Sequence, residues 1–213
     1  MKKIILGGLG LAIAGNIGYN YWMYKKVYPT HIDAMTYYYR IIPGYIDAIE
    51  KEYKVLDQTK ESFNELYNRG DISMMTLYYE SPGMILDKQK CKSTVGFSAK
   101  GKLSLKEEQQ VSRGMKKVIL PPFDAIAIPA KNLKSPKAMS MYSFILLLYY
   151  TRKVLKKQGL GDASYVPVIG ITSEDKSYLC MPLPDFLKPF FFVENPIVSK
   201  IPLPQNSSQK KER

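Results

Sequence analysis

The sequence predicts an α+β domain with an antiparallel sheet, preceded by one N-terminal transmembrane helix. The order strand, helix, strand, strand occurs twice between residues 34 and 183, and such a repeated β-α-β-β unit builds an antiparallel sheet with helices on one side. Residues 4–23 carry no charged side chain, as a segment in a bilayer core requires. We therefore expect three parts: a transmembrane anchor at residues 1–28, the duplicated domain at 29–186 and a short basic tail at 187–213.

The anchor segment has the length and the flanks of a transmembrane helix. At about 1.5 Å per residue, its uncharged part spans about 30 Å, the thickness of a hydrocarbon core. Lysines flank both ends, so the charges leave the orientation open. Ala12-Ile13-Ala14 fits a signal-peptidase site, but cleavage there would release a peptide shorter than the usual length of about 15–30 residues. Aromatic residues typical of a membrane interface gather at the C-terminal end: Tyr19, Tyr21, Trp22 and Tyr24.

The faces of this helix predict contacts with other transmembrane helices. Small residues permit close helix packing, and amides in lipid require hydrogen-bond partners. Asn16 and Asn20 lie on a face different from that of the small residues. A plain anchor that tolerates glycine is the alternative interpretation. The small residues on one face are Gly7, Gly10, Ala14 and Gly18.

The first half of the domain reads as strand, helix, strand, strand. Residues 34–42 are apolar and aromatic, and Pro43 ends the run. Helical spacing of apolar residues follows and is clearest over Lys60–Tyr67. Residues 73–80 and 91–98 have the composition of strands.

The second half repeats this order. Residues 117–128 contain strand material interrupted by two prolines. Residues 136–158 show the clearest helical pattern, with a proline in the first turn and basic residues in the last turns. Residues 165–172 and 177–183 read as two strands joined by a tight turn. The stretch 99–116 between the halves is polar and reads as a linker.

Composition narrows the classes of partner. The net charge of +12 favours an acidic protein surface or anionic lipid. Nucleic acid is not favoured, because no basic stripe alternates with aromatic residues. Cys91 and Cys180 are the only cysteines and do not form a disulfide framework, so we expect two reduced thiols, with a single bridge as the alternative.

The inventory of reactive residues argues against catalysis. His31 is the only histidine and falls between the anchor and the domain, so neither a histidine-based triad nor a multi-histidine metal site can form in one chain. No phosphate-binding loop, dinucleotide fingerprint or nucleophile elbow occurs. We therefore expect no cofactor and no metal. Glu80 is the one acid in a position to bind a cation or act as a general base, and a capped strand-end acid is its plainer interpretation.

An ordered series of short segments carries a family resemblance over residues 34–183. The segments are Leu77-Tyr78-Tyr79-Glu80-Ser81-Pro82, Met84, Asp87-Lys88, Cys91 and Val95-Gly96, with Tyr38–Gly44, Tyr45, Lys117–Ile128 and Tyr165–Leu183. The series resembles the testis-expressed ER-phagy receptor family, whose members carry a GyrI-like (SOUL-type effector-binding) domain behind a membrane anchor.

The resemblance implies two β-α-β-β halves related by a pseudo-twofold axis, with a cleft between them. It further implies a small hydrophobic or cationic ligand in the cleft, as in bacterial relatives, or an adaptor role at the ER membrane. The autophagy motif of those receptors is absent here, because the tail around Phe190-Phe191-Phe192-Val193 has basic rather than acidic neighbours. Our candidates for lining the cleft, of which strand alternation allows only some to face it, are Tyr39, Tyr78, Tyr79, Glu80, Tyr142 and Tyr178.

These observations predict a non-catalytic, membrane-anchored binding adaptor or accessory subunit of a membrane protein complex. Both the mitochondrial inner membrane and the endoplasmic reticulum membrane fit the sequence. Other transmembrane helices are the expected partners. The alternatives are an ER-phagy receptor-like protein and a small GyrI-like hydrolase that uses Glu80.

We predict that the N-terminal segment is retained and embedded in a membrane. Carbonate extraction should leave the protein in the membrane pellet, because the stretch 4–23 would be held by the hydrocarbon core and not by surface charges that alkali disrupts. Recovery of the protein in the supernatant, or a mature N-terminus at Gly15, would show that the segment is not an anchor.

Overall fold

The structure is a computed structural model, and it describes the core of the domain in several stretches. The described residues are 27–43, 46–79, 92–130, 167–174, 176–190 and 192, with four residues of one helix at 147, 149, 153 and 156. Within these stretches, no helix is long and apolar enough to cross a membrane. The predicted anchor lies outside the described residues and stays a prediction.

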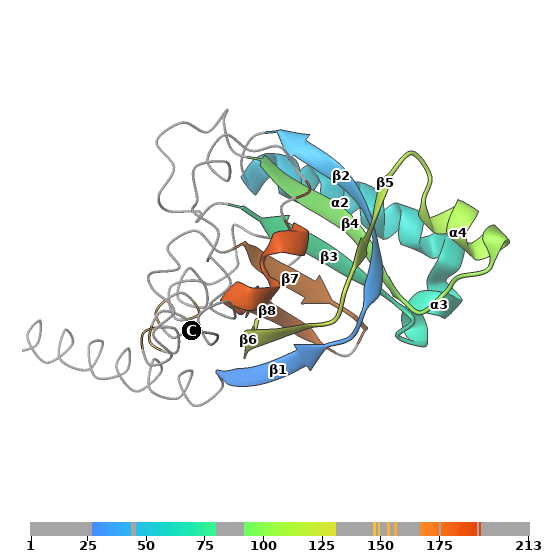
Figure 1. Cartoon of the computed structure of the whole chain (residues 1–213). Coiled ribbons are helices and arrows are strands. Elements are labelled where there is room, and N and C mark those ends of the chain that lie inside the picture. Colours follow the sequence, from blue (N-terminus) through green and yellow to red (C-terminus); the bar gives the residue numbers. More distant parts are fainter. Residues whose placement is uncertain are drawn as a thin grey trace, which may run out of the picture.

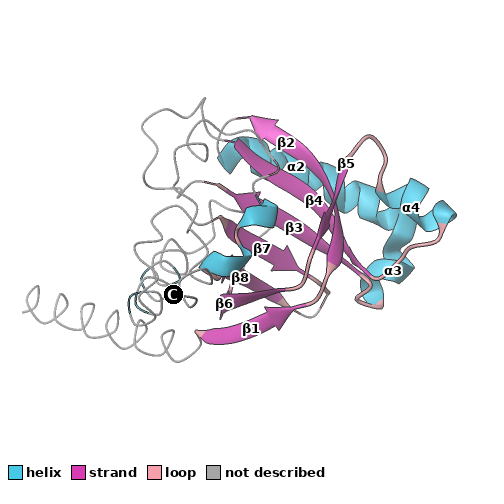
Figure 2. Cartoon of the chain, viewed as in Figure 1, coloured by secondary structure: helices cyan, strands magenta, loops and turns pink. Residues whose placement is uncertain are grey.

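The described elements form an eight-stranded antiparallel sheet with helices on one face and two helical turns on the other (Figures 1 and 2). The strands are β1 (Tyr28–Ile32), β2 (Met35–Pro43), β3 (Ile72–Tyr78), β4 (Lys92–Lys100), β5 (Lys116–Leu120), β6 (Phe123–Pro129), β7 (Val168–Thr172) and β8 (Ser177–Pro182). The helices are α2 (Ile46–Lys60), α3 (Asn64–Asn68) and α4 (Leu105–Val111), and the 3-10 turns are η1 (Glu61–Phe63), η2 (Pro184–Phe186) and η3 (Lys188–Phe190).

The strand order β1-β6-β8-β7-β3-β4-β2-β5 divides the sheet into two equivalent halves. β2, β3 and β4 are neighbours in the first half, and β6, β7 and β8 are neighbours in the second. The halves join where β3 pairs with β7, from Met74↔Thr172 to Tyr78↔Val168. The helix α2 lies between β2 and β3 in the chain, and the four described residues 147–156 are helical between β6 and β7. The predicted α+β class and the duplicated order of elements are confirmed.

Two long, bent strands pair with each other across both halves. The chain runs from β1 directly into β2, and from β5 directly into β6 (Figure 1). Residues 28–32 pair with 123–127, and residues 35–39 pair with 116–120, in one continuous antiparallel register. Asp33-Ala34 and Pro121-Pro122 interrupt the ladder at the bend, where proline has no N–H to donate. Each half therefore obtains its edge strand from the segment that precedes the other half.

This arrangement confirms one expectation and corrects another. Residues 117–128 contain strand material interrupted by the two prolines, as expected, and the two pieces, β5 and β6, belong to opposite halves of the sheet. His31 does not lie in a linker but in β1, where its Nδ1 is 2.7 Å from Oδ1 of Asp124 on β6. The sequence signal for β1 was weak because only five residues, with polar Thr30 and His31 among them, form the strand.

The polar stretch 99–116, expected to be a linker, contains the helix α4. Ser104 caps it: the Ser104 hydroxyl accepts from the Glu107 N–H, and the Glu107 carboxylate accepts from the Ser104 N–H at 2.8 Å. Such a capping box satisfies two backbone donors that a helix otherwise leaves unpaired. Reading the stretch as a linker was wrong, because the cap and not an apolar pattern marks this helix.

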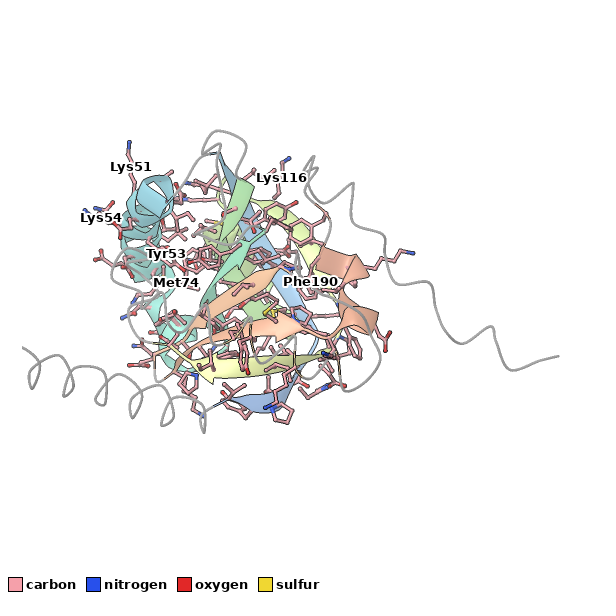
Figure 3. All side chains as sticks on the ribbon, turned by 90° about the vertical axis from the view of Figure 1, so that its left-hand side faces the viewer. Lys51, Tyr53, Lys54, Met74, Lys116 and Phe190 are labelled. Atoms are coloured by element: carbon pink, nitrogen blue, oxygen red, sulfur yellow. The ribbon has the colours of Figure 1, made fainter. Side chains whose placement is uncertain are left out.

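A core lies between the sheet and the helices. Tyr53 of α2 is 2 % exposed and its hydroxyl hydrogen-bonds that of Thr76 on β3. Figure 3 shows Tyr53 and Met74 between helix and sheet, with Lys51 and Lys54 pointing outward from the same helix and Phe190 on the opposite face of the sheet. The side chains of one strand alternate between the two faces, so the sheet carries a second core on the face that the helices leave free.

Gly96 is a position at which the pairing of two strands depends on the absence of a side chain. A Cβ atom on Gly96 of β4 would lie 1.9 Å from the carbonyl oxygen of Tyr38 on β2. Real Cβ atoms do not approach backbone this closely, so β2 would have to move away from β4, and β4 is the central strand of the first half.

We predict that Gly96→Ala destabilises the domain by about 3 kcal/mol or more, because overpacking against backbone has no soft side chain to absorb it. Denaturant unfolding of the full chain in detergent measures the loss. Gly101→Ala is the matched control: Gly101 has φ +77° with nothing near a Cβ, so that substitution should cost only about 1–2 kcal/mol. Equal effects at both glycines would contradict the steric interpretation.

Candidate functional site

The face of the sheet opposite the helices, which we call the inner face, carries the candidate site. Its buried side chains come from every strand except β4, which contributes Gly96 and short polar residues. They are Ile32, Met35, Tyr37, Tyr39, Met75, Leu77, Tyr79, Leu120, Phe123, Ala125, Ala127, Ile169, Ile171 and Cys180.

One end of the inner face is filled by the chain itself. The turns η2 and η3 cross it (Figure 1), and Phe190 is fully buried with its ring 4.9 Å from that of Phe123. The Tyr79 hydroxyl donates to the Phe190 carbonyl oxygen at 2.8 Å. The Phe192 ring lies 4.8 Å from Tyr39 and 6.5 Å from Tyr79. We had placed residues 187–190 and 192 in the tail. They pack against the domain instead, because the rings of Tyr39, Tyr79 and Phe123 offer them an apolar surface.

Tyr37 packs under the aromatic residues of this filled end and makes hydrogen bonds to β3 and β4. Its ring stacks on Tyr39 at 5.4 Å, and its hydroxyl lies 3.1 Å from both the Met75 carbonyl oxygen, to which it donates, and the Thr94 hydroxyl. Burial raises the pKa of Tyr37 and of Tyr79 well above the usual tyrosine value. Both phenols are therefore neutral hydrogen-bond donors at physiological pH.

The other end of the inner face is open and contains a cavity of about 600 Å³. Ile32, Met35 and Ile171 form an apolar floor, and Ser73 and Ser98 are buried beside them. Further lining residues stand toward solvent at the rim. These are Tyr28, Thr30, Asp33, Lys100, Pro129, Ser173, Lys176, Ser177 and Tyr178.

The strand register arranges the cavity wall in two levels. Ser98 pairs with Ser73 across β4 and β3, and Ser173 follows the pair Met74↔Thr172, which places it at the level of Ser73. The Ser173 N–H donates to the Lys176 carbonyl oxygen at 2.8 Å, so Lys176 continues this polar level. One level further along the strands, Met75, Ile171 and Tyr178 are paired in sequence across β3, β7 and β8. Of these three, Ile171 and Tyr178 line the cavity.

Two tyrosines of the cavity rim, Tyr28 and Tyr178, have raised pKa values. Burial raises the pKa of Tyr178 well above its usual value, and the nearby Cys180 adds to the shift. The same two causes raise the pKa of Tyr28. Cys180 itself is a buried free thiol, and burial raises its pKa strongly as well. The two phenols are therefore neutral at physiological pH and present weakly polar surfaces to the cavity.

The structure brings together only part of the predicted cleft. Tyr178 lines the cavity. Tyr39 and Tyr79 face the same side of the sheet, but they lie in the filled end against Phe192. Placing Tyr78 in the cleft was wrong: it is 4 % exposed and belongs to the core between sheet and helices, because alternation turns it away from Tyr79.

The remaining candidates lie outside the described residues. They are Glu80, Cys91 and Tyr142, with the membrane-segment residues Gly7, Gly10, Ala14, Asn16, Gly18, Asn20, Tyr19, Tyr21, Trp22 and Tyr24. Within the described part, no group of three or more His, Cys, Asp or Glu side chains could hold a metal ion. Sequence reasoning missed the serines and lysines of the cavity, since nothing in a single strand marks them as neighbours.

No family model matches the sequence, and no curated protein matches it. Among solved structures, the chain is similar to a hydrolase encoded by lin2189 from Listeria innocua (11% identity, 74% of this chain and 91% of that chain, TM-score 0.46). It is also similar to SAV2435 bound to tetraphenylphosphonium (14% identity, 74% and 93%, TM-score 0.44) and to the EcmrR C-terminal domain (11% identity, 73% and 95%, TM-score 0.39). These identities and scores are too low to transfer a ligand or an activity to this chain.

Proposed function

We propose that this chain is a membrane-anchored binding domain that holds a small ligand in its inner-face cavity and works as an adaptor or accessory subunit of a membrane protein complex. The observation that carries the proposal is the cavity of about 600 Å³ in a face that is otherwise filled. Small-molecule sites in proteins commonly enclose about 300–1,000 Å³.

The contrast between the two ends of the inner face supports a binding role. At the filled end, Phe190 and Phe192 occupy the aromatic surface that a ligand would otherwise contact. At the open end, buried Ile171 and Met35 lie beside serine hydroxyls and remain accessible through the rim. A ligand would therefore enter at the open end, beside Lys100 and Lys176, and not at the filled end, where Tyr39 and Tyr79 contact Phe192.

The lining of the cavity supports binding over hydrolysis. A general base acts best as a carboxylate or imidazole held at the reacting atom. The described floor is formed by Ile32, Met35, Ser73, Ser98 and Ile171, and Asp33 at the rim is exposed. We accordingly propose that the domain binds without catalysing a reaction, and that the Glu80-dependent hydrolase is the weaker alternative.

The packing of the C-terminal segment supports the accessory-subunit setting over an autophagy receptor. An aromatic-x-x-aliphatic motif must be exposed to dock on its partner, whereas Phe190 is 0 % exposed and its backbone carbonyl accepts from Tyr79. The uncharged segment 4–23, with its glycines and asparagines, supports contacts inside a membrane complex. Either the mitochondrial inner membrane or the endoplasmic reticulum membrane is compatible with this role.

Filling the cavity should weaken ligand binding. Ile171→Trp places an indole in the cavity from its floor and should weaken binding of any small ligand there by about tenfold or more. Val55→Trp is the matched control, because Val55 lies on α2 and is 37% exposed. Calorimetry of the full chain in zwitterionic nanodiscs would use two probes, 1-naphthyl phosphate and tetraphenylphosphonium, the ion bound to SAV2435 in its structure. Failure of both probes to bind, or equal binding by both variants, would rule out this function.

The accessory role predicts that the N-terminal helix packs against partner helices. Gly10→Leu with Gly18→Leu should lower the yield of co-purifying partners from gently solubilised membranes, because leucine blocks close approach on that face. Leucine is at least as apolar, so carbonate extraction should show unchanged insertion. Native gels with mass spectrometry identify the partners. Full co-purification of the double variant would leave the helix as a plain anchor.

A further inference from the structure

Two lysines stand at the mouth of the inner-face cavity. Lys100 ends β4 and Lys176 lies in the turn before β8; both are exposed. Asp33 is the one carboxylate among the described residues that line the cavity, and none of the three makes an ion pair with another described residue. Two positive groups against one negative group favour an anion at the mouth.

The backbone holds both lysines in place. The Lys100 N–H donates to the Asp71 carbonyl oxygen at 2.9 Å. The Lys176 carbonyl oxygen accepts from both the N–H and the hydroxyl of Ser173, at 2.8 and 3.2 Å. The side chains are long and mobile, but they start from fixed points on the same side of the cavity mouth.

A row of hydroxyl groups lies beside the lysines. Ser98, Ser73 and Ser173 occupy one level of three neighbouring strands, and all three line the cavity. The Ser98 hydroxyl donates to the Ser73 carbonyl oxygen at 3.4 Å, a long bond that a better acceptor would readily replace. Serine hydroxyls rotate to donate to an anion's oxygens.

Apolar side chains lie beside this row. Ile171 is one level further along β7 and lines the cavity. Met35 is the cross-strand partner of Lys100 and lines the cavity together with Ile32. All three side chains are buried. The cavity therefore offers apolar surface next to its lysines and hydroxyls, which suits a molecule with a charged head and an apolar body.

We propose that the cavity binds an amphipathic anion, with a carboxylate or phosphate head between Lys100, Lys176 and the serine row, and an apolar body against Ile171 and Met35. This inference rests on the proposed binding function and adds the chemical class of the ligand. Head recognition by lysine and hydroxyl donors is charge-assisted, whereas the body gains free energy from burial of apolar surface.

The test compares probes of matched body and opposite charge on the full chain in nanodiscs of phosphatidylcholine. 1-Naphthyl phosphate should bind about tenfold more tightly than (1-naphthylmethyl)trimethylammonium, with a difference that shrinks as salt rises. Inorganic phosphate alone should bind more weakly than naphthyl phosphate, because it leaves the apolar floor unused.

Lysine substitutions locate the head. Lys100→Ala and Lys176→Ala should each weaken naphthyl phosphate binding by about threefold, as expected for exposed charges. Lys54→Ala removes the same charge from the outer side of α2 (Figure 3) and should leave binding unchanged. Lys100→Glu with Lys176→Glu should invert the order of the two naphthyl probes.

The outcomes separate this inference from the function on which it rests. One outcome is that the ammonium probe binds as tightly as naphthyl phosphate while Ile171→Trp weakens the binding of both. In that case the cavity binds ligands, but the anionic class of ligand is wrong. If phosphate alone matches naphthyl phosphate, the amphipathic part is wrong. If Ile171→Trp affects no probe, both the inference and the binding function are wrong.

Discussion

The antiparallel ladder between the bent strands 28–43 and 116–129 is the contact on which the rest of the structure depends. It joins segments far apart in the chain and continues through both halves of the sheet in one register. A slip by one residue would exchange the two faces along both strands. The faces that carry the helix-side core and the inner-face site are therefore set by the same pairing.

The inner face is divided by how its two ends are covered. Aromatic side chains at one end attract Phe190 and Phe192 of the chain's own C-terminal segment, because burial of rings is favourable without any further partner. At the other end, serines and exposed lysines offer no comparable apolar surface. The cavity therefore lies where polar and apolar residues together form its wall.

Duplication explains the shape of the site but not its chemistry. The two halves place β2 and β6 at equivalent positions, yet β2 brings Tyr37 and Tyr39 to the inner face while β6 brings Ala125 and Ala127. The equivalent strands therefore present different side chains to the same face. The cavity itself is lined by residues of both halves, Ser73 and Lys100 from one and Ile171 and Tyr178 from the other.

The sequence by itself was enough to predict most strands, the helical stretches and the membrane segment. Alternation, helical spacing and the uncharged stretch 4–23 are all local patterns. Strand alternation in the sequence also implied that Tyr78 and Tyr79 point to opposite faces of the sheet. It did not indicate which of the two faces the inner side. Only the tertiary structure decided that Ser73, Ser98 and Ser173 share one level, because strand pairing brings together residues about a hundred positions apart. Likewise, only packing could show that Phe190 and Phe192, at the start of the predicted tail, cover the aromatic end, since burial depends on partners that no local pattern indicates.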